Sequence, residues 1–141
     1  GQQEAKTKDA NIFYVKSVPH DWLFPHMAGA VHHGGAGTTA TSLRHALPTL
    51  VVPFGGDQPF WAERVYAAGC GPKAIPRDKL TAENLAEGLR ALISNPEYTR
   101  NAACIGEALR NEHGCANAAD LIEKAVWDWE NGNPAQDGMN I

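Results

Sequence analysis

Short apolar runs alternate with segments of helical spacing over the first 80 residues. The apolar runs at 12–16, 28–33, 50–52 and 73–75 have the length and composition of β-strands. Between them, apolar positions at helical spacing predict one helix over 38–46 and a second from Phe60 to Ala68, with Asp57 at its cap. Strands that alternate with helices predict an α/β fold: a Rossmann-like parallel sheet of about four strands with helices on its faces.

The last third of the chain predicts helices alone. Thr81 and Asn84 open a helix that Asn95-Pro96 ends, and two more helices are expected at about 97–111 and 116–130. These elements form one domain over 12–130, between a polar lead at 1–11 and a flexible tail at 131–141. A doubly wound nucleotide-binding sheet normally has about six strands, so the pattern predicts a domain that is incomplete at its N-terminal side.

Composition narrows the class of protein. The 141 residues include 12 Lys+Arg and 16 Asp+Glu, and the net charge of −4 argues against a nucleic-acid binder. Residues 1–10 are polar and lack a signal-peptide core, and no apolar run approaches the ~20 residues of a membrane span. The three cysteines, Cys70, Cys104 and Cys115, form no CxxC pair, so we expect no disulfide framework and a cytoplasmic setting.

A glycine-rich turn at 34–37 joins the strand at 28–33 to the helix that follows. Glycine lets the backbone approach a ligand closely, and the free N–H groups and dipole of a helix start attract anions. Thr38 and Thr39 add hydroxyl donors, and His33 precedes the turn, so the pattern predicts a phosphate or diphosphate site. The alternative is a tight turn that serves packing alone.

A second polar loop, Gly55-Gly56-Asp57-Gln58, follows the next buried strand. The carboxylate of Asp57 and the amide of Gln58 could hold neighbouring sugar hydroxyls. The alternative is that Asp57 caps a helix and Gln58 is merely solvated. Because loops at the carboxyl ends of parallel strands share one edge of the sheet, the two motifs together favour a ligand with both phosphate and sugar.

The sequence lacks the motifs of several other classes of binding and catalytic site. There is no GxGxxG, no Lys of a GxxxxGK[ST] loop and no GxSxG nucleophile. The histidines at 20, 26, 32 and 33 are near one another in sequence, but no Cys or carboxylate completes a ligand set, so no metal site is predicted. We expect His32 to be packed or hydrogen-bonded.

The motifs in order resemble a known family. The segment from Val18 to His26, the segment from His32 to Thr39, and Gly55-Gly56-Asp57-Gln58 look like the donor box of family 1 glycosyltransferases. Within that family they are most similar to the sterol 3-β-glucosyltransferases. The resemblance implies the C-terminal, nucleotide-sugar-binding domain of a GT-B fold, in which two Rossmann-like domains enclose the reaction.

The family's binding residues are assigned to this sequence by their positions in the motifs. The resemblance implies that uracil is bound at Val18 and His20, the diphosphate at His33, Gly35, Ala36, Gly37, Thr38 and Thr39, and the sugar at Asp57 and Gln58. Two departures are present: Thr41 stands where plant members have a ribose-binding Glu, and Ala36-Gly37 replaces their Trp-Asn.

The resemblance implies an inverting transfer of glucose from UDP-glucose to a sterol 3-hydroxyl, with no cofactor and no obligatory metal. It places the catalytic base and the lipid acceptor site in an N-terminal half outside these residues, so we assign no catalytic residue and expect no turnover from the isolated chain. The alternatives are transfer to another lipid or small-molecule acceptor, and a donor-binding subunit that works with a separate acceptor subunit. An exposed sheet edge predicts association with the missing segment or with a second copy, and a sterol substrate implies peripheral membrane contact by the full-length protein.

Overall fold

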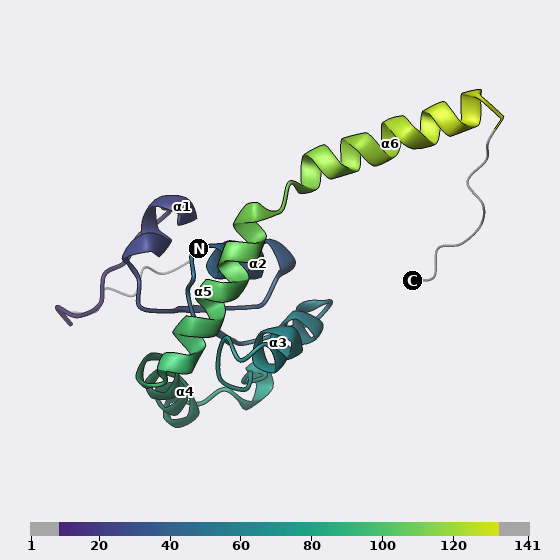
Figure 1. The fold of residues 1–141 in the computed structure, drawn as a ribbon. Helices are drawn as coiled ribbons and strands as arrows, with labels where there is room; N and C mark the ends of the chain where they lie inside the picture. The colour runs from purple at the N-terminus through teal and green to yellow at the C-terminus, as the bar shows by residue number, and fades with distance from the viewer. Residues whose placement is uncertain (1–8, 133–141) are drawn as a thin grey trace.

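The computed structural model describes residues 9–132. Its helices and strands, in chain order, are α1 (His20–Leu23), the 3-10 helix η1 (Phe24–His26), β1 (Ala30–His32), α2 (Ala36–Arg44), β2 (Thr49–Val51), α3 (Gln58–Ala67), the 3-10 helix η2 (Arg77–Lys79), α4 (Ala82–Ser94), α5 (Pro96–Asn111) and α6 (Gly114–Glu130). Figure 1 shows α5 crossing in front of the other elements, with α6 reaching away from them.

The regular sheet consists of β1 and β2, which pair in parallel with Val31 opposite Leu50. Helix α2 forms the crossover between them, as the sequence predicts. All three residues of β2 are buried, since relative exposures run from 0% at Thr49 and Leu50 to 1% at Val51. This full burial is what the apolar run at 50–52 predicts for a parallel strand covered on both faces.

A third segment runs along the other side of β2. Thr49 N donates to Cys70 O (2.9 Å), and Ile75 N donates to Val51 O (3.0 Å). The six residues from Cys70 to Ile75 lie opposite only three on β2, so the intervening backbone bulges and the strand predicted at 73–75 is not regular. Gly71 allows this close approach, because a Cβ there would lie 1.8 Å from Thr49 O.

The prediction of a strand at 12–16 is wrong. These residues form neither helix nor strand, and Ile12, Phe13, Tyr14 and Val15 are 50–89% exposed. A β-prone sequence forms a strand only where a neighbouring strand supplies hydrogen-bond partners, and none of the described elements does so here. The sheet therefore has two regular strands instead of about four, within the predicted α/β class.

Helices α2, α3 and α5 enclose the core. Its buried cluster consists of Leu43, Val51, Ala62, Val65, Cys70 and Ala102. Helix α2 begins at Ala36, two residues before the predicted start, because the glycine loop itself enters the helix. The three cysteines are free, as expected.

The C-terminal helices follow the prediction closely. Thr81 and Asn84 form a capping box at the start of α4, and the Asn95 side chain accepts from Glu97 N to cap α5. Helix α6 begins two residues before the predicted start, and none of its residues is buried. No described helix has the length and apolarity that crossing a membrane requires.

Candidate functional site

The turn between β1 and α2 depends on a glycine in the left-handed region. Gly34 has φ +89°, and its N–H donates to Nδ1 of His32 across 3.0 Å. A Cβ at Gly34 would lie 2.5 Å from Val51 Cγ1 and 3.2 Å from the carbonyl oxygen of Gln58. Glycine is therefore required both by the conformation and by the close packing on β2 and α3.

Helix α2 begins without a side-chain cap. Gly35 is the N-cap residue in an extended conformation, and within residues 9–132 no side chain accepts a hydrogen bond at this cap. The first turn closes with Thr39 N donating to Gly35 O at 2.9 Å. The N–H groups of Ala36, Gly37 and Thr38 precede that bond and have no carbonyl within the helix to receive them, which is the arrangement that favours an anion at the start of a helix.

The imidazole of His33 lies against this helix start. A Cβ built at Gly35 would be 2.5 Å from Nε2 of His33, so the ring occupies the space that Gly35 leaves open. His33 is exposed. The structure thus gathers the imidazole and the first-turn N–H groups at one place, as the diphosphate prediction requires.

The position of Thr39 narrows that prediction. Its side chain is 3% exposed and its N–H already bonds to Gly35 O. Its Oγ1 is buried, with no hydrogen-bond partner in the described part of the chain. Thr39 therefore presents no donor at the surface, whereas His33 and the residues from Gly35 to Thr38 stay predicted diphosphate contacts.

The alternative for the second loop, with Asp57 as a helix cap and Gln58 solvated, does not hold. Asp57 occupies the N-cap position of α3, but within the described residues its side chain makes no capping hydrogen bond. Its Oδ2 instead accepts from Trp61 Nε1 at 2.9 Å. Gln58 is half-buried, and its Oε1 accepts from Phe54 N (2.7 Å) and Gly55 N (3.2 Å), which leaves its NH2 group on the other side.

The two loops meet, as expected for one edge of a parallel sheet. Gly34 packs on the Gln58 backbone, since a Cβ at Gly34 would also lie 3.7 Å from the Gln58 Cβ. The turn before α2 and the first residue of α3 therefore lie side by side.

The segment predicted to bind uracil is fixed by aromatic packing. Val18 is half-buried, and the His20 ring stacks on Phe24 with 4.7 Å between centroids. Phe24 in turn packs edge-on against His45 at the end of α2, at 6.0 Å. Residues 18–20 thus connect to the same helix that forms the anion site.

His32 is held neutral. Burial, then the charges of His33 and His20, lower its pKa to about 4. Within residues 9–132, no group of three or more His, Cys, Asp or Glu is placed to hold a metal ion. The prediction that His32 is packed or hydrogen-bonded is confirmed by its bond with Gly34.

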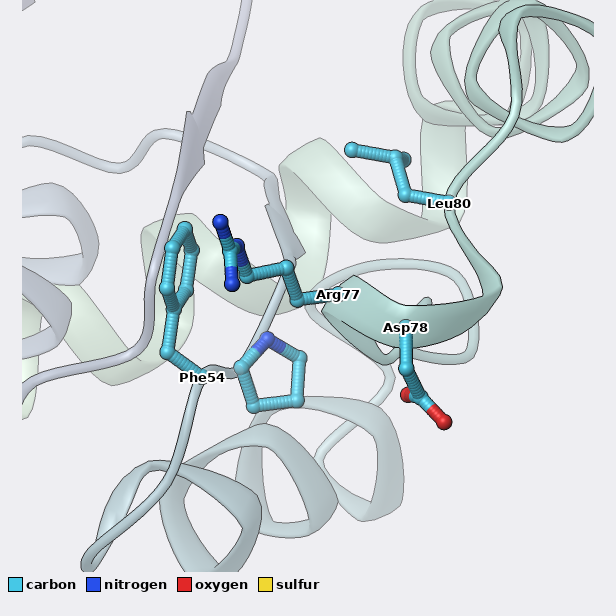
Figure 2. A pocket seen from close by; sticks show the side chains of 5 residues that line it. Phe54, Arg77, Asp78 and Leu80 are labelled. Atoms are coloured by element: carbon cyan, nitrogen blue, oxygen red, sulfur yellow. The ribbon is translucent and has the colours of Figure 1, made fainter.

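A pocket that sequence reasoning missed adjoins the second loop. It has a volume of about 450 Å³ and is lined by Pro53, Phe54, Arg77, Asp78 and Leu80. Figure 2 shows the Arg77 guanidinium beside the Phe54 ring, and its central carbon is 5.0 Å from the ring centroid. The sequence feature that could have indicated this pocket is Phe54, an apolar residue that belongs to neither the helical nor the strand pattern.

Comparison with known proteins identifies the family. Residues 2–123 match the family described as the C-terminal domain of erythromycin biosynthesis protein CIII-like proteins. The chain belongs to this glycosyltransferase family. The match agrees with the GT-B resemblance that the motifs indicate.

Curated relatives of this family member are sterol 3-beta-glucosyltransferases. UGT80B1 of Arabidopsis thaliana is 46% identical over 114 residues, which cover 81% of this chain and 18% of the relative. The enzyme of Pichia angusta is 43% identical over 111 residues, covering 79% of this chain and 9% of the relative. The chain thus spans less than a fifth of the length of these relatives.

Solved structures of glycosyltransferases share the fold. The kitacinnamycin glycotransferase superposes with a TM-score of 0.70 at 30% identity, covering 77% of this chain and 28% of that one. The glycosyltransferase VinC, solved in complex with dTDP, gives a TM-score of 0.69 at 33% identity, covering 73% and 26%. The described domain is therefore an α/β domain of the GT-B C-terminal type.

Proposed function

We propose that the chain is the donor-binding part of an inverting glycosyltransferase that moves glucose from UDP-glucose to a sterol 3-hydroxyl. The observation that carries the proposal is the contact between Gly34 and Gln58, which joins an anion site and a sugar-binding pair on one surface. A nucleoside diphosphate sugar offers both chemistries in one molecule.

The diphosphate lies at the start of α2 in this proposal. The N–H groups of Ala36, Gly37 and Thr38 and the His33 imidazole donate to its oxygens. When the bond to the anomeric carbon breaks, negative charge grows on the leaving diphosphate, and donors fixed beforehand stabilise that charge. The chain supplies this counter-charge itself, so the proposal includes no obligatory metal and no cofactor.

The sugar lies over the start of α3. The Asp57 carboxylate accepts hydrogen bonds from sugar hydroxyls, and the Gln58 amide donates to a neighbouring one. The acceptor hydroxyl attacks the anomeric carbon from the face opposite the diphosphate, which inverts the configuration in one step. The base that takes its proton belongs to the acceptor half of the enzyme, as do the sterol contacts.

Support for a sterol acceptor comes from the curated relatives, which are sterol 3-beta-glucosyltransferases. A different small-molecule acceptor is the second candidate, because the family description and the solved neighbours name erythromycin and kitacinnamycin proteins. The net charge of −4 disfavours nucleic acid as a partner. We place the full-length protein in the cytoplasm, in peripheral contact with the membrane that holds its sterol.

Calorimetric titration with UDP and with UDP-glucose tests the donor site. We expect His33→Ala to weaken both ligands and Asp57→Ala to weaken UDP-glucose alone. His113→Ala, an exposed histidine at the start of α6, is the matched control and should change neither. Absence of UDP binding to a chain that is folded by circular dichroism would refute the proposal.

Sterol glucosylation is tested on the full-length protein. Radiolabelled glucose should pass from UDP-glucose to a sterol in detergent micelles, and a panel of polyketide aglycones should accept less. The reverse preference would support the second candidate and leave the donor assignment intact.

A further inference from the structure

His32 is hydrogen-bonded both to the glycine loop and to the end of β2, and its Nε2 atom is buried. Its Nδ1 accepts the Gly34 N–H at 3.0 Å, and its backbone carbonyl accepts from Val52 N at 2.8 Å. The residue is thus bonded to the glycine loop through its side chain and to the end of β2 through its main chain.

Gly34 transmits that restraint to Gln58. Its φ is +89°, and a Cβ added there would lie 2.5 Å from Val51 Cγ1 and 3.2 Å from the Gln58 carbonyl oxygen, so Gly34 packs closely on both β2 and α3. A shift of Gly34 would change the distance between the start of α2 and the start of α3. Binding one ligand at both places requires that distance to be fixed in advance.

We propose that His32 is a positioning residue that fixes Gly34 and, through it, the spacing between the diphosphate and sugar parts of the site. This inference rests on the proposed function. It assigns His32 no contact with the ligand, in contrast to its neighbour His33.

The geometry requires one tautomer. Because Nδ1 accepts a hydrogen bond, the proton resides on Nε2, an atom that is buried without a partner among residues 9–132. Protonation of Nδ1 would replace the acceptor with a second donor facing Gly34 N–H. The titratable groups that act on His32 are His33, whose ring centroid is 6.3 Å away, and His20.

Two substitutions separate positioning from packing. His32→Asn retains an oxygen acceptor near Nδ1 but has less volume, whereas His32→Phe retains an aromatic ring and has no acceptor. Loss of one hydrogen bond of this kind corresponds to about a 2- to 10-fold change in an equilibrium constant. We therefore expect His32→Phe to weaken UDP-glucose by about that factor and UDP by less, and His32→Asn to stay near wild type.

Calorimetry on the 141-residue chain with UDP and UDP-glucose measures these affinities, and amide hydrogen exchange by NMR follows Gly34 directly. Protection of the Gly34 amide should persist in His32→Asn and fall in His32→Phe. The inference is overturned if Phe preserves both affinity and protection while Asn loses them, as a packing role would require.

The exchange measurement needs no ligand. If the wild-type chain binds no UDP, the proposed function fails, and the Gly34 amide still decides whether His32 positions the loop. If wild type binds UDP-glucose and His32→Phe binds it equally well, the inference alone fails.

Discussion

The Asp57 carboxylate accepts a hydrogen bond from the indole of Trp61, one helical turn along α3, with 2.9 Å between Oδ2 and Nε1. Asp57 is exposed and Trp61 half-buried, so the bond holds a surface carboxylate by a side chain anchored in the domain. One carboxylate oxygen is engaged in this way, which leaves the other to accept from a ligand.

Trp61→Phe should therefore weaken UDP-glucose about 2- to 10-fold, because the carboxylate loses the hydrogen bond that orients it. UDP without the sugar should bind as before. Calorimetry with both ligands measures the difference, and Trp127→Phe on the exposed surface of α6 is the control. An equal loss for UDP and UDP-glucose would mean that Trp61 supports the whole site and not Asp57 in particular.

Gly35→Ala should displace His33 from the start of α2. The new Cβ would lie 2.5 Å from Nε2 of His33, and the imidazole would have to rotate away. We expect UDP affinity to fall to the value of His33→Ala, and the double variant to fall no further. Gly55→Ala is the control, because a Cβ there meets nothing within 4 Å. Additive losses in the double variant would show that the two residues act separately.

The sequence was sufficient for features that depend on local chemistry. Helix starts at Thr81 and Asn95 follow from side chains that cap the backbone nearby, and the structure contains both caps. The edge shared by the glycine loop and Gln58 followed from parallel topology, which places the carboxyl ends of strands together.

The sequence was insufficient where contacts between distant parts of the chain determine the local structure. Residues 12–16 have strand composition and no strand partner among the described elements, so composition alone gave the wrong state. Thr39 was expected at the ligand, but its position one turn into α2 buries it. The sequence contains no motif that predicts the hydrogen bond from Trp61 to Asp57. The same is true of the contact between Arg77 and Phe54.

The capping box at α4 provides a test of stability. Thr81 Oγ1 accepts from Asn84 N at 3.2 Å, and Asn84 Oδ1 accepts from Thr81 N at 2.9 Å. Thr81→Ala should lower the free energy of unfolding by about 1 kcal/mol. Urea denaturation measures the change, with Ser94→Ala in the last turn of the same helix as the control. A loss equal to that of the control would show that the box contributes no stability.

The cysteines should differ in reactivity. Cys104 and Cys115 are exposed, whereas burial and then the nearby Cys104 raise the pKa of Cys70 to about 11. The thiolate is the reactive form, so Cys70 should resist alkylation at neutral pH. Mass spectrometry after brief iodoacetamide treatment should find label on Cys104 and Cys115, and on Cys70 only after denaturation. Rapid labelling of Cys70 in the folded chain would contradict its placement in the core.

The pKa of His32 makes a prediction about acid stability. Since the pKa in the folded chain is about 4 and the ordinary value is 6.5, the unfolded chain binds the proton more readily between these limits. The contribution of neutral His32 to stability is therefore fully present above pH 6.5 and is lost as the pH falls toward about 4. Urea midpoints measured from pH 7 to pH 4 should fall more steeply for wild type than for His32→Asn, which carries no titrating ring.

His113→Asn is the matched control for that series, because it removes an exposed histidine at the amino end of α6 and should leave the wild-type slope unchanged. Wild type and both variants contain the same carboxylates, so the carboxylate contribution cancels when the slopes are compared. Parallel curves for wild type and His32→Asn would mean that His32 is solvated in the folded chain, and the hydrogen bond from Gly34 would then have no role in the acid range. A steeper wild-type curve, with His113→Asn superimposed on it, would locate the acid-sensitive group at the turn that joins the two loops.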